Sequence, residues 1–329
     1  MPVRVEQIKE ACFLSCITTV SGDIKAENLG FCQSHEHLFI AKGHSFHINP
    51  DICINDEEKS IQEARLYKKA GGDAVVDAQP IGTGRDAAAL ERISRESGVH
   101  IIASTGFHKL LFYPREHWIF SCSEDMLSHI FIRELTAGMY GLCDEHMPEQ
   151  KTHFRAGQIK AALDSGSFTD TYRKLFLAAA NAANQTGRVL MVHIEAGSDP
   201  VALAEFLGRE KVNSEKIVFC HLDRAIPDLG VHKEICARKI ALEYDTIARP
   251  KYHSDQRETE ILLDMLKDGC ENRILMGLDT TRARLKSYDG NIGLDYILNQ
   301  FVPALMAAGV PQKVINKIFT DNPARIFSH

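Results

Sequence analysis

Short apolar runs rich in β-branched side chains recur along the chain, and each is bounded by glycine or polar residues. Such runs are typical of buried parallel strands, which are covered on both faces and therefore lack the alternation of half-exposed strands. Eight of them occur, at residues 29–34, 73–78, 100–105, 157–162, 188–193, 216–221, 240–244 and 273–278. We expect these segments to form one parallel sheet.

Amphipathic segments separate the predicted strands. Between residues 170 and 183, apolar side chains recur at intervals of three and four, which places them on one face of a helix, and Gly187 closes the segment. A second apolar stripe, from Ile261 to Leu266, ends before Gly269, a residue type expected just beyond a helix terminus. Eight rounds of strand and helix in roughly 250 residues predict an α/β fold of the (β/α)8 TIM-barrel type.

The two ends of the chain add to the predicted barrel. Residues 13–20 have the pattern of a strand and precede a turn at residues 21–23, so we expect a short N-terminal β-hairpin. We also expect a C-terminal helix. Because no low-complexity linker or abrupt change of composition divides the chain, residues 1–329 are expected to form a single barrel domain.

One long segment interrupts the alternation of strands and helices. Residues 106–121, which follow the third predicted strand, are rich in aromatic side chains, among them Phe107, Phe112 and Trp118. The segment is either an ordinary packed loop or a lid or wall of a pocket, since loops that follow strands surround the active face of a barrel. The sequence leaves both interpretations open.

Composition and charge restrict the class of partner. Hydrophobic residues make up 44% and charged residues 25%, as in an ordinary globular protein. With 38 lysines and arginines against 44 aspartates and glutamates, the net charge is -6, so no basic field exists to hold nucleic acid or an anionic membrane. We therefore expect a small-molecule partner.

Cysteine usage and hydropathy bear on the location of the protein. The nine cysteines are odd in number, scattered and without a Cys-x-x-Cys pair, which indicates reduced thiols rather than a disulfide framework. No apolar run approaches the ~20 residues of a membrane span. Residues 11–20 match the core of a signal peptide only in part, because Ser15, Thr18 and Thr19 interrupt them. We expect a cytoplasmic protein.

Four histidines and one aspartate stand at the carboxyl ends of predicted strands. His35 and His37 end the first strand two residues apart, so both can project to the same side. His193 and His221 end the fifth and sixth strands, and Asp279 follows the eighth. On one rim these groups would bury several charges without a counter-ion, which is costly unless a cation is present.

The ligand types narrow the choice of cation. Imidazole and carboxylate suit Zn²⁺, Mn²⁺, Fe²⁺ or Co²⁺, and five or more ligands exceed what one tetrahedral ion requires. We therefore expect two divalent metal ions, zinc first, with manganese or cobalt as alternatives.

The fourth predicted strand offers Lys160 as the source of a bridging anion. An ammonium group only donates and cannot ligate a metal, but a lysine that has reacted with CO2 becomes a carbamate with two anionic oxygens. The alternative is an ordinary lysine paired with Asp164 or Glu195. The residue pattern alone does not go beyond that alternative.

Five motifs stand in order along the chain: Ser-His-Glu-His-Leu at residues 34–38, Arg-Ala-Gly-Gln-Ile-Lys at 155–160, the strand-end histidines, Gly-Leu-Asp at 277–279 and Asn-Pro-Ala-Arg-Ile-Phe at 322–327. Together they resemble the phosphotriesterase-like branch of the amidohydrolase superfamily, from about residue 13 to the C-terminus. An ordered set over nearly the whole chain is far more specific than one His-x-His pair. The resemblance implies that the single domain is a metal-dependent hydrolase barrel of the amidohydrolase type.

The resemblance also implies which residues hold the metal ions. It divides six ligands into a more buried site of His35, His37 and Asp279 and a second site of His193 and His221, bridged by a carboxylated Lys160. All six residue types are present, so carboxylation of Lys160 becomes the expected state on the strength of the resemblance.

The mechanism expected of such a centre follows from the charge of its ions. A hydroxide that bridges two cations is a nucleophile at neutral pH, while one cation polarises the electrophilic oxygen. Asp279 would take the proton and pass it to the leaving alkoxide, as a general acid and base. The alternative is that Asp279 is a ligand only.

Cationic side chains cluster after the seventh and eighth predicted strands, in residues 249–253 and 280–288. In barrels the loops after these strands commonly make a phosphate site, and arginine matches phosphate oxygens in bidentate fashion. The pattern resembles family members that hydrolyse phosphorylated sugar lactones, which implies an anionic substrate such as a phosphorylated aldono-1,4-lactone. The residues expected to hold the phosphate are Lys251, Arg282, Arg284 and Tyr288. The alternative is that these cationic side chains lie on the surface in contact with solvent and bind no ligand.

The third predicted strand departs from the family pattern. Many lactonases of the family carry a tyrosine soon after the Thr-Gly pair, whereas this chain has Phe107 and His108. His108 is expected to take the place of that tyrosine in the substrate pocket. The alternative is that His108 is a loop residue without contact to the substrate.

Other functions stay open at this point. A phosphotriesterase or an acyl-homoserine lactonase could use the same metal site, although either would favour an apolar pocket without the cation cluster. A more remote alternative is a non-catalytic metal-binding barrel. A homodimer is compatible with the sequence.

Overall fold

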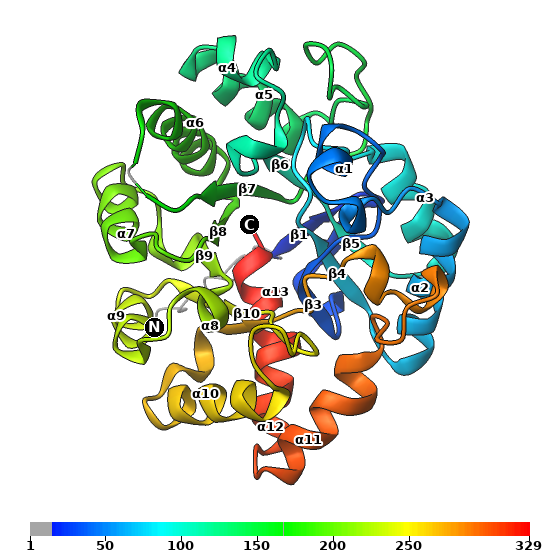
Figure 1. Ribbon diagram of the computed structural model, residues 1–329, viewed down its shortest axis with the longest axis vertical. Coiled ribbons are helices and arrows are strands. Elements are labelled where there is room, and N and C mark those ends of the chain that lie inside the picture. The colour runs from blue at the N-terminus through cyan, green and yellow to red at the C-terminus, as the bar shows by residue number, and fades with distance from the viewer. Residues whose placement is uncertain (1–14, 167) are drawn as a thin grey trace, which may run out of the picture.

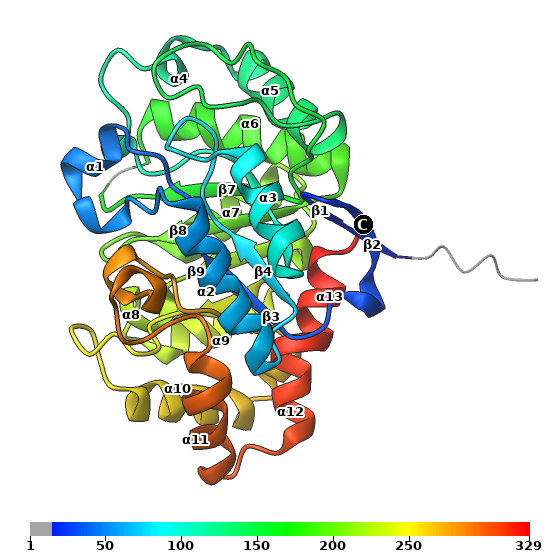
Figure 2. The ribbon, with the colours of Figure 1, turned by 90° about the vertical axis from the view of Figure 1, so that its right-hand side faces the viewer.

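An antiparallel hairpin and the C-terminus meet at one end of the molecule. The computed structural model describes residues 15–166 and 168–329. Strands β1 (Cys16–Thr19) and β2 (Gly22–Lys25) pair antiparallel, with the turn at residues 20–21 instead of 21–23. Residues 13 and 14 of the predicted strand lie outside the described residues. Backbone hydrogen bonds between Cys16 and His329 join the hairpin to the C-terminus (Figure 2).

Parallel strands form the ring at the centre of Figure 1. They pair in two ladders, β3-β4-β5 and β6-β7-β8-β9-β10-β11. Their bounds are β3 (Cys32–Glu36), β4 (Ala74–Asp77), β5 (His100–Ile102), β6 (Ser104–Gly106), β7 (Gln158–Leu163), β8 (Val189–Ile194), β9 (Ile217–Cys220), β10 (Ala241–Tyr244) and β11 (Ile274–Met276).

The two ladders are joined to each other at two places, between β5 and β6 and between β11 and β3, and these junctions close the ring. The predicted strand 100–105 is divided into β5, which pairs with β4, and β6, which pairs with β7, because the carbonyl of Ala103 between them accepts from Gly157 and Gln158. At the other place Asp279 N donates to His35 O over 2.9 Å, which joins the end of β11 to β3. Since β5 and β6 share one position, the eight positions of the predicted barrel are confirmed.

A layer of helices surrounds the strands (Figure 1). The outer helices are α2 (Glu57–Ala70), α3 (Ala87–Ser97), α5 (Glu124–Thr136), α6 (Asp170–Thr186), α7 (Pro200–Arg209), α9 (Leu229–Ala237), α10 (Asp255–Lys267), α11 (Val302–Ala307), α12 (Gln312–Asn316) and α13 (Asn322–Phe327). Short helices lie in the loops that follow strands: α1 (His44–Ile48), α4 (Trp118–Ser121) and α8 (Leu222–Ala225). The expected C-terminal helix is α13.

Helix α6 shows how the sequence sets these elements. Thr169 caps its first turn by accepting from Tyr172 N, and Gly187, with φ of 67°, ends it in the left-handed conformation that glycine adopts without steric cost. The apolar face predicted from residues 170–183 is buried, with Leu175 and Phe176 fully inaccessible. Burial of this face is what holds the helix on the barrel, because helical stability in proteins comes mainly from packing.

Two apolar clusters divide the core. The larger one lies between strands and helices, whereas the smaller one joins inward-facing strand residues such as Val76, Met191 and Leu275 to Ile326 and Phe327 of α13. Helix α13 thus covers one end of the barrel, seen beneath the ring in Figure 1. The apolar filling at this end leaves the opposite, carboxyl end of the strands for polar side chains.

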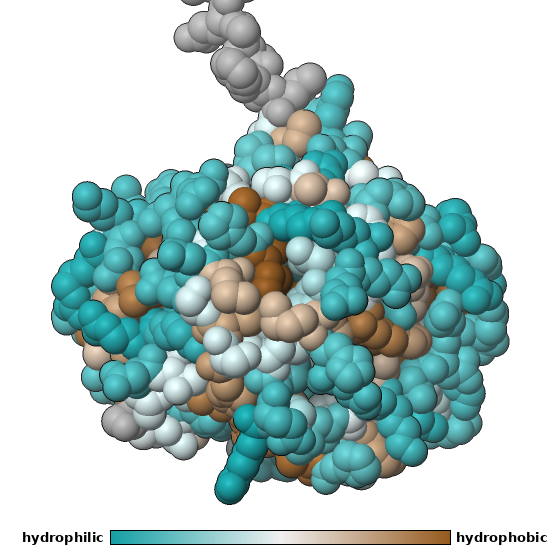
Figure 3. Space-filling model, turned by 90° about the horizontal axis from the view of Figure 1, so that it is seen from above, coloured by the Kyte–Doolittle hydropathy of each residue, from teal (hydrophilic) through white to brown (hydrophobic). Residues whose placement is uncertain are grey.

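The surface over α4 and α5 is mainly hydrophilic, with apolar side chains visible in the furrows between elements (Figure 3). Among the described residues, no helix is both long and apolar enough to cross a bilayer.

Candidate metal centre

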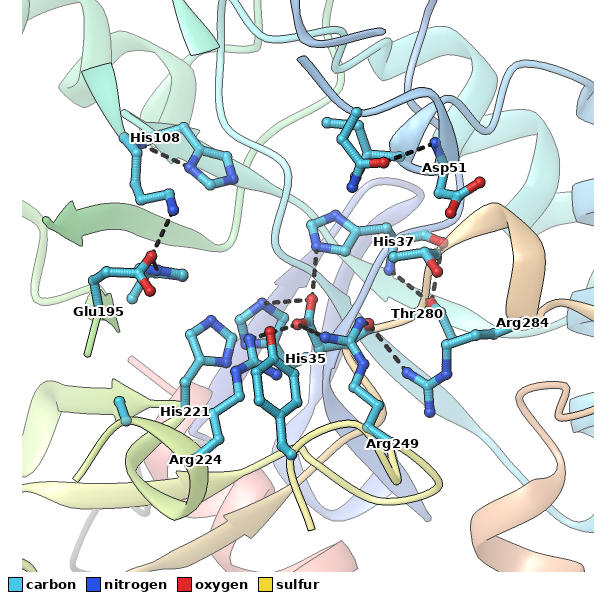
Figure 4. A pocket seen from close by; sticks show the side chains of 18 of the residues that line it. His35, His37, Asp51, His108, Glu195, His221, Arg224, Arg249, Thr280 and Arg284 are labelled. Atoms are coloured by element: carbon cyan, nitrogen blue, oxygen red, sulfur yellow. Dashed lines mark hydrogen bonds and ion pairs between the residues drawn. The ribbon is translucent and has the colours of Figure 1, made fainter. Parts of the chain in front are cut away.

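A cavity of about 560 Å³ opens at the carboxyl ends of the strands. All six predicted metal ligands line it: His35, His37, Lys160, His193, His221 and Asp279. They come from five different strands or the residues just after them, and Figure 4 shows His35 and His221 close together, with His37 beside them. The structure therefore brings together residues that are up to 244 positions apart in the sequence (279 − 35).

The distances divide these residues into two groups. His37 Nε2 lies 3.4 Å and His35 Nε2 3.8 Å from Asp279 Oδ1, and the three side chains offer ligand atoms within 4.8 Å of one another. The rings of His193 and His221 form a second pair with centroids 4.4 Å apart, and the ring of His221 is 4.8 Å from that of His35. The first group can hold one cation, and the second group adds two imidazoles beside it.

Buried carboxylates orient two of the histidines. His35 Nδ1 lies 2.9 Å from Glu243 Oε2, and His221 Nδ1 lies 2.6 Å from Asp245 Oδ2. These contacts direct the Nε2 atoms of both rings into the cavity, which is the arrangement found around metal-binding histidines.

Burial also keeps these imidazoles in the form that binds metal. It lowers the pKa of His35 and His221 well below the ordinary value, and it lowers that of His193. Neutral imidazole is the ligating species, so the donor set fits a divalent metal.

Lys160 is almost fully buried, with 2% of its surface exposed. Within the described part of the chain the one hydrogen bond of its side chain is to His35 Nε2, over 3.2 Å. An ammonium ion in this position finds one acceptor, His35 Nε2, for its three N–H groups and would occupy that nitrogen, whereas a carbamate would place two anionic oxygens there and leave Nε2 to a metal ion. The surroundings of Lys160 therefore fit a bridging anion better than an ion pair with Asp164 or Glu195, to which no contact from Lys160 is found among the described residues.

Two arginines surround Asp279. Arg224 Nη2 lies 2.8 Å and Arg249 Nη1 3.0 Å from Asp279 Oδ2. Burial alone would raise the pKa of Asp279, but Arg249 and Arg224 hold it well below the ordinary value. The side chain is thus an ionised carboxylate, as both a metal ligand and a proton acceptor must be.

The backbone at the site is strained. His221 has φ of 65° and Asp279 φ of 47°, both in the left-handed region that residues with a side chain rarely adopt. Such conformations cost about 1–3 kcal/mol each and persist where the surroundings enforce them, as at functional sites.

The first part of the aromatic segment 106–121 forms a wall of the cavity, and the rest packs into the core. His108, Lys109 and Phe112 line the cavity, whereas Tyr113 and Trp118 are buried. Both interpretations of this segment therefore apply, each to a different part of it.

His108 lies where the sequence predicted a substrate contact. Its ring is 6.0 Å from that of His193, and burial lowers its pKa well below the ordinary value. Beside it, Lys109 Nζ is 2.5 Å from Glu195 Oε2, which in turn is 3.2 Å from His193 Nε2. The hydrogen bond to His193 lowers the pKa of Glu195, so this side of the cavity carries an ionised carboxylate.

The four predicted phosphate ligands separate into two pairs. Lys251 and Arg284 line the cavity, together with Arg249. Arg282 and Tyr288 are not among the described residues that line the cavity. The Arg282 guanidinium lies 5.3 Å from the centre of the Tyr288 ring, and the Tyr288 hydroxyl donates to Asp56 O over 2.7 Å. The two residues lie in successive 3-10 turns after β11, Arg282–Arg284 and Lys286–Tyr288, and the second turn packs against α2.

Arg284 and Lys251 differ in how much of their charge is available. The Arg284 guanidinium donates to backbone carbonyls of Leu278, Asp279 and Ile247, so most of its donors are occupied. Lys251 is exposed and has no ion pair with a carboxylate in the described ranges; its Nζ lies 4.7 Å over the Tyr252 ring. Lys251 is therefore the cation best able to bind an anionic ligand directly.

Sequence reasoning missed Arg224, Glu243 and Asp245. Arg224 follows His221 by three residues on the one-turn helix α8, and the two acids flank Tyr244 at the end of β10. The signal that could have found them is position, since Glu243 and Asp245 stand at the end of a buried strand and Arg224 lies in the first turn after another, where polar groups gather.

A barrel with this rim of histidines and carboxylates defines a metal-dependent hydrolase. The model of the phosphotriesterase family matches residues 15–327, and the chain belongs to this family, whose members use a binuclear metal centre. The resemblance found in the sequence is thereby confirmed.

Known proteins resemble the chain over nearly its whole length. It is 28% identical to the N-acetyltaurine hydrolase of Danio rerio, covering 94% of this chain and 97% of that protein. It is 27% identical to a phospho-furanose lactonase of Mycoplasmopsis agalactiae, covering 95% and 91%. The crystal structure of a lactonase from Listeria monocytogenes superposes with a TM-score of 0.86 at 28% identity, covering 95% of this chain and 99% of that one.

Proposed function

We propose that the protein hydrolyses the ester bond of a lactone that carries an anionic group, with a phosphorylated aldono-1,4-lactone as the best candidate. The observation that carries the proposal is that one cavity holds both the metal-ligand rim and a cationic wall of Arg249, Lys251 and Arg284. The similarity to a phospho-furanose lactonase and to a lactonase of known structure supports it.

We propose that two divalent ions, zinc first and manganese or cobalt as substitutes, occupy the rim. His35, His37 and Asp279 would hold one ion, His193 and His221 the other, and a carboxylated Lys160 would bridge them. When bound, such a pair supplies an activated water molecule as nucleophile and polarises the ester carbonyl.

Residues of the chain would transfer the proton and bind the substrate. Asp279 accepts the proton of the attacking water and returns it to the ring oxygen as the carbon–oxygen bond of the ester breaks, so that the products are a carboxylic acid and an alcohol. Arg224 and Arg249 keep Asp279 ionised and oriented. Lys251 binds the phosphate, and His108 contacts the sugar from the opposite wall.

A second candidate function has support from one relative. The N-acetyltaurine hydrolase of Danio rerio is 28% identical to this chain, and a sulfonate would suit the same cationic wall. Hydrolysis of an N-acylated aminosulfonate is therefore the alternative to lactone hydrolysis. Neutral organophosphate triesters and acyl-homoserine lactones fit less well, because they offer no anion to Lys251.

The test compares three substrates on zinc-loaded protein: an aldonolactone with a 5-phosphate, the same lactone without it, and N-acetyltaurine. Acid release is followed for the lactones and taurine release for the amide, with Asp279→Asn and Lys251→Ala beside the wild type. We expect turnover of the phosphorylated lactone, its loss in Asp279→Asn, and a raised KM in Lys251→Ala.

Two results would contradict the proposal. If only N-acetyltaurine is hydrolysed, the amide function replaces the lactonase. If both lactones react equally and Lys251→Ala behaves as the wild type, the anion-binding role of the wall is wrong.

A further inference from the structure

A second cluster of potential metal ligands lies outside the cavity lining. Asp223 on α8, His253 in the loop after β10 and Glu258 in the first turn of α10 offer ligand atoms within 4.8 Å of one another. Asp223 and Glu258 are buried, and the His253 side chain is 14% exposed. None of the three belongs to the rim described above.

Glu258 is the unexplained member of this cluster. Its residue is 0% exposed, and neither carboxylate oxygen has a hydrogen-bond partner among residues 15–166 and 168–329. His253 Nε2 lies 3.2 Å from its Oε2, and the carboxyl group of Asp223 is a second close neighbour. A buried carboxylate without a donor is costly, so the site calls for a positive group.

The hydrogen bond of His253 directs its lone pair toward Glu258. His253 Nδ1 lies 3.2 Å from the carbonyl of Ser254, which can only accept, so Nδ1 carries the hydrogen in this contact. Nε2 is then free to ligate. A backbone carbonyl behind one ring nitrogen and a carboxylate facing the other fit a metal-binding histidine, whose non-ligating nitrogen is held by a hydrogen bond.

Neighbouring charges are already engaged elsewhere. Arg224, the nearest cation along the chain, pairs with Asp245 and Asp279 in the cavity. Asp255 accepts from Ala248 N and from the Tyr296 hydroxyl. The cluster thus has two carboxylates, and the imidazole of His253 is the one basic side chain among its three members.

We propose that Asp223, His253 and Glu258 form a structural site for a divalent metal ion, with Zn²⁺ as the first candidate. One imidazole and two carboxylates are a ligand set that zinc accepts, with water completing the coordination. This site is separate from the binuclear centre and does not depend on the proposed substrate.

The position of the site gives it a role. Asp223 Oδ2 accepts from the backbone of Asp245 and Thr246, and His253 ends the loop that carries Arg249 and Lys251. A metal ion bound there joins α8, this loop and α10. It would therefore hold the cationic wall of the cavity in place.

A proton is the competitor of the metal. Burial, together with the carboxylate of Asp223, raises the pKa of Glu258 well above its ordinary value. A protonated Glu258 could share its hydrogen with a neighbour, and the cluster would then hold no metal.

The experiment counts zinc and locates it. Metal-free protein is loaded with zinc, freed of excess and analysed for zinc per chain, in wild type, Glu258→Gln, His253→Gln and the control Glu260→Gln, an exposed position of the same helix. Crystals of the zinc-loaded wild type are measured at the zinc absorption edge, where an anomalous peak reports the ion directly.

We expect an anomalous peak beside His253 Nε2 and one zinc ion per chain fewer in Glu258→Gln and His253→Gln than in wild type and Glu260→Gln. The proposal is overturned if the wild-type crystals show no peak there, whatever the variants do, or if all four proteins bind the same amount of zinc. Because the readout is a difference at this cluster, failure of the lactonase proposal would leave it unaffected.

Discussion

The six residues of the proposed metal rim and the three residues of the cationic wall line one cavity, but the sequence predicted the rim better than the wall. All six rim residues predicted from the sequence line the cavity, whereas only Lys251 and Arg284 of the four predicted phosphate ligands do. Rim residues stand at the ends of buried strands, and wall residues stand in loops. The comparison shows that the position of a side chain at a strand end can be predicted from the sequence, whereas the position of a side chain in a loop cannot.

The two regions also differ in how firmly their side chains are held. In the rim, His35 and His221 each contact a buried carboxylate, and Lys160 is nearly inaccessible. In the wall, Lys251 is exposed and has only a cation–π contact within the described residues. Substitutions should therefore act on chemistry in the rim and on substrate affinity in the wall.

The largest effect is expected from Lys160→Met. If Lys160 bridges the metal pair as proposed, its replacement abolishes binding of the pair and with it several kcal/mol of transition-state stabilisation, about a thousandfold or more in kcat. Metal content and turnover are measured together, with exposed Lys267→Met as the control. A variant that retains two metal ions and full activity would show that Lys160 does not bridge.

The next largest effect is expected from Asp245→Asn. The change weakens the contact to His221 Nδ1 and the ion pair with Arg224, and loss of such an orienting group costs roughly 10–100-fold in metal affinity or activity. Zinc affinity is measured by competition with a chelator. The control is Asp228→Asn, at an exposed helix cap, which should leave the zinc affinity unchanged. An equal loss of zinc affinity in both variants would show that Asp245 has no specific role in orienting His221.

A smaller effect separates the members of the wall. Lys251→Ala should raise the KM for a phosphorylated lactone about tenfold with little change in kcat, since a charge-assisted hydrogen bond contributes about 1.5 kcal/mol or more. Arg282→Ala should leave KM unchanged, because its guanidinium lies over Tyr288. Steady-state kinetics on both variants decide this, and a raised KM in Arg282→Ala as well as in Lys251→Ala would restore the assignment made from the sequence.

The smallest effect is expected from Tyr288→Phe. The hydroxyl contacts Asp56 O and Ser60 Oγ, so its removal should lower the free energy of unfolding by about 1 kcal/mol and leave KM within the error of the wild type. Urea denaturation and steady-state kinetics are the measurements. A raised KM without loss of stability would place Tyr288 at the substrate after all.

The sequence was sufficient wherever a short-range pattern decided the outcome. Periodicity located the strands and the helix at residues 170–186, and strand ends located His35, His193 and Asp279 on one rim. The sequence was insufficient where one segment could pair with either of two neighbouring strands. The division of residues 100–105 into β5 and β6 depends on which neighbour each half pairs with, and no local pattern contains that choice.

By itself the sequence determined the barrel and the residues that meet at its candidate metal centre, because the parallel strands of a barrel bring their carboxyl ends to one rim, whatever the loops do. Only the tertiary structure decided which cations enter the cavity, that Arg224 and Arg249 pair with Asp279, and that Asp223, His253 and Glu258 meet. The physical reason is that loop side chains are placed by packing and hydrogen bonds between segments distant in the chain.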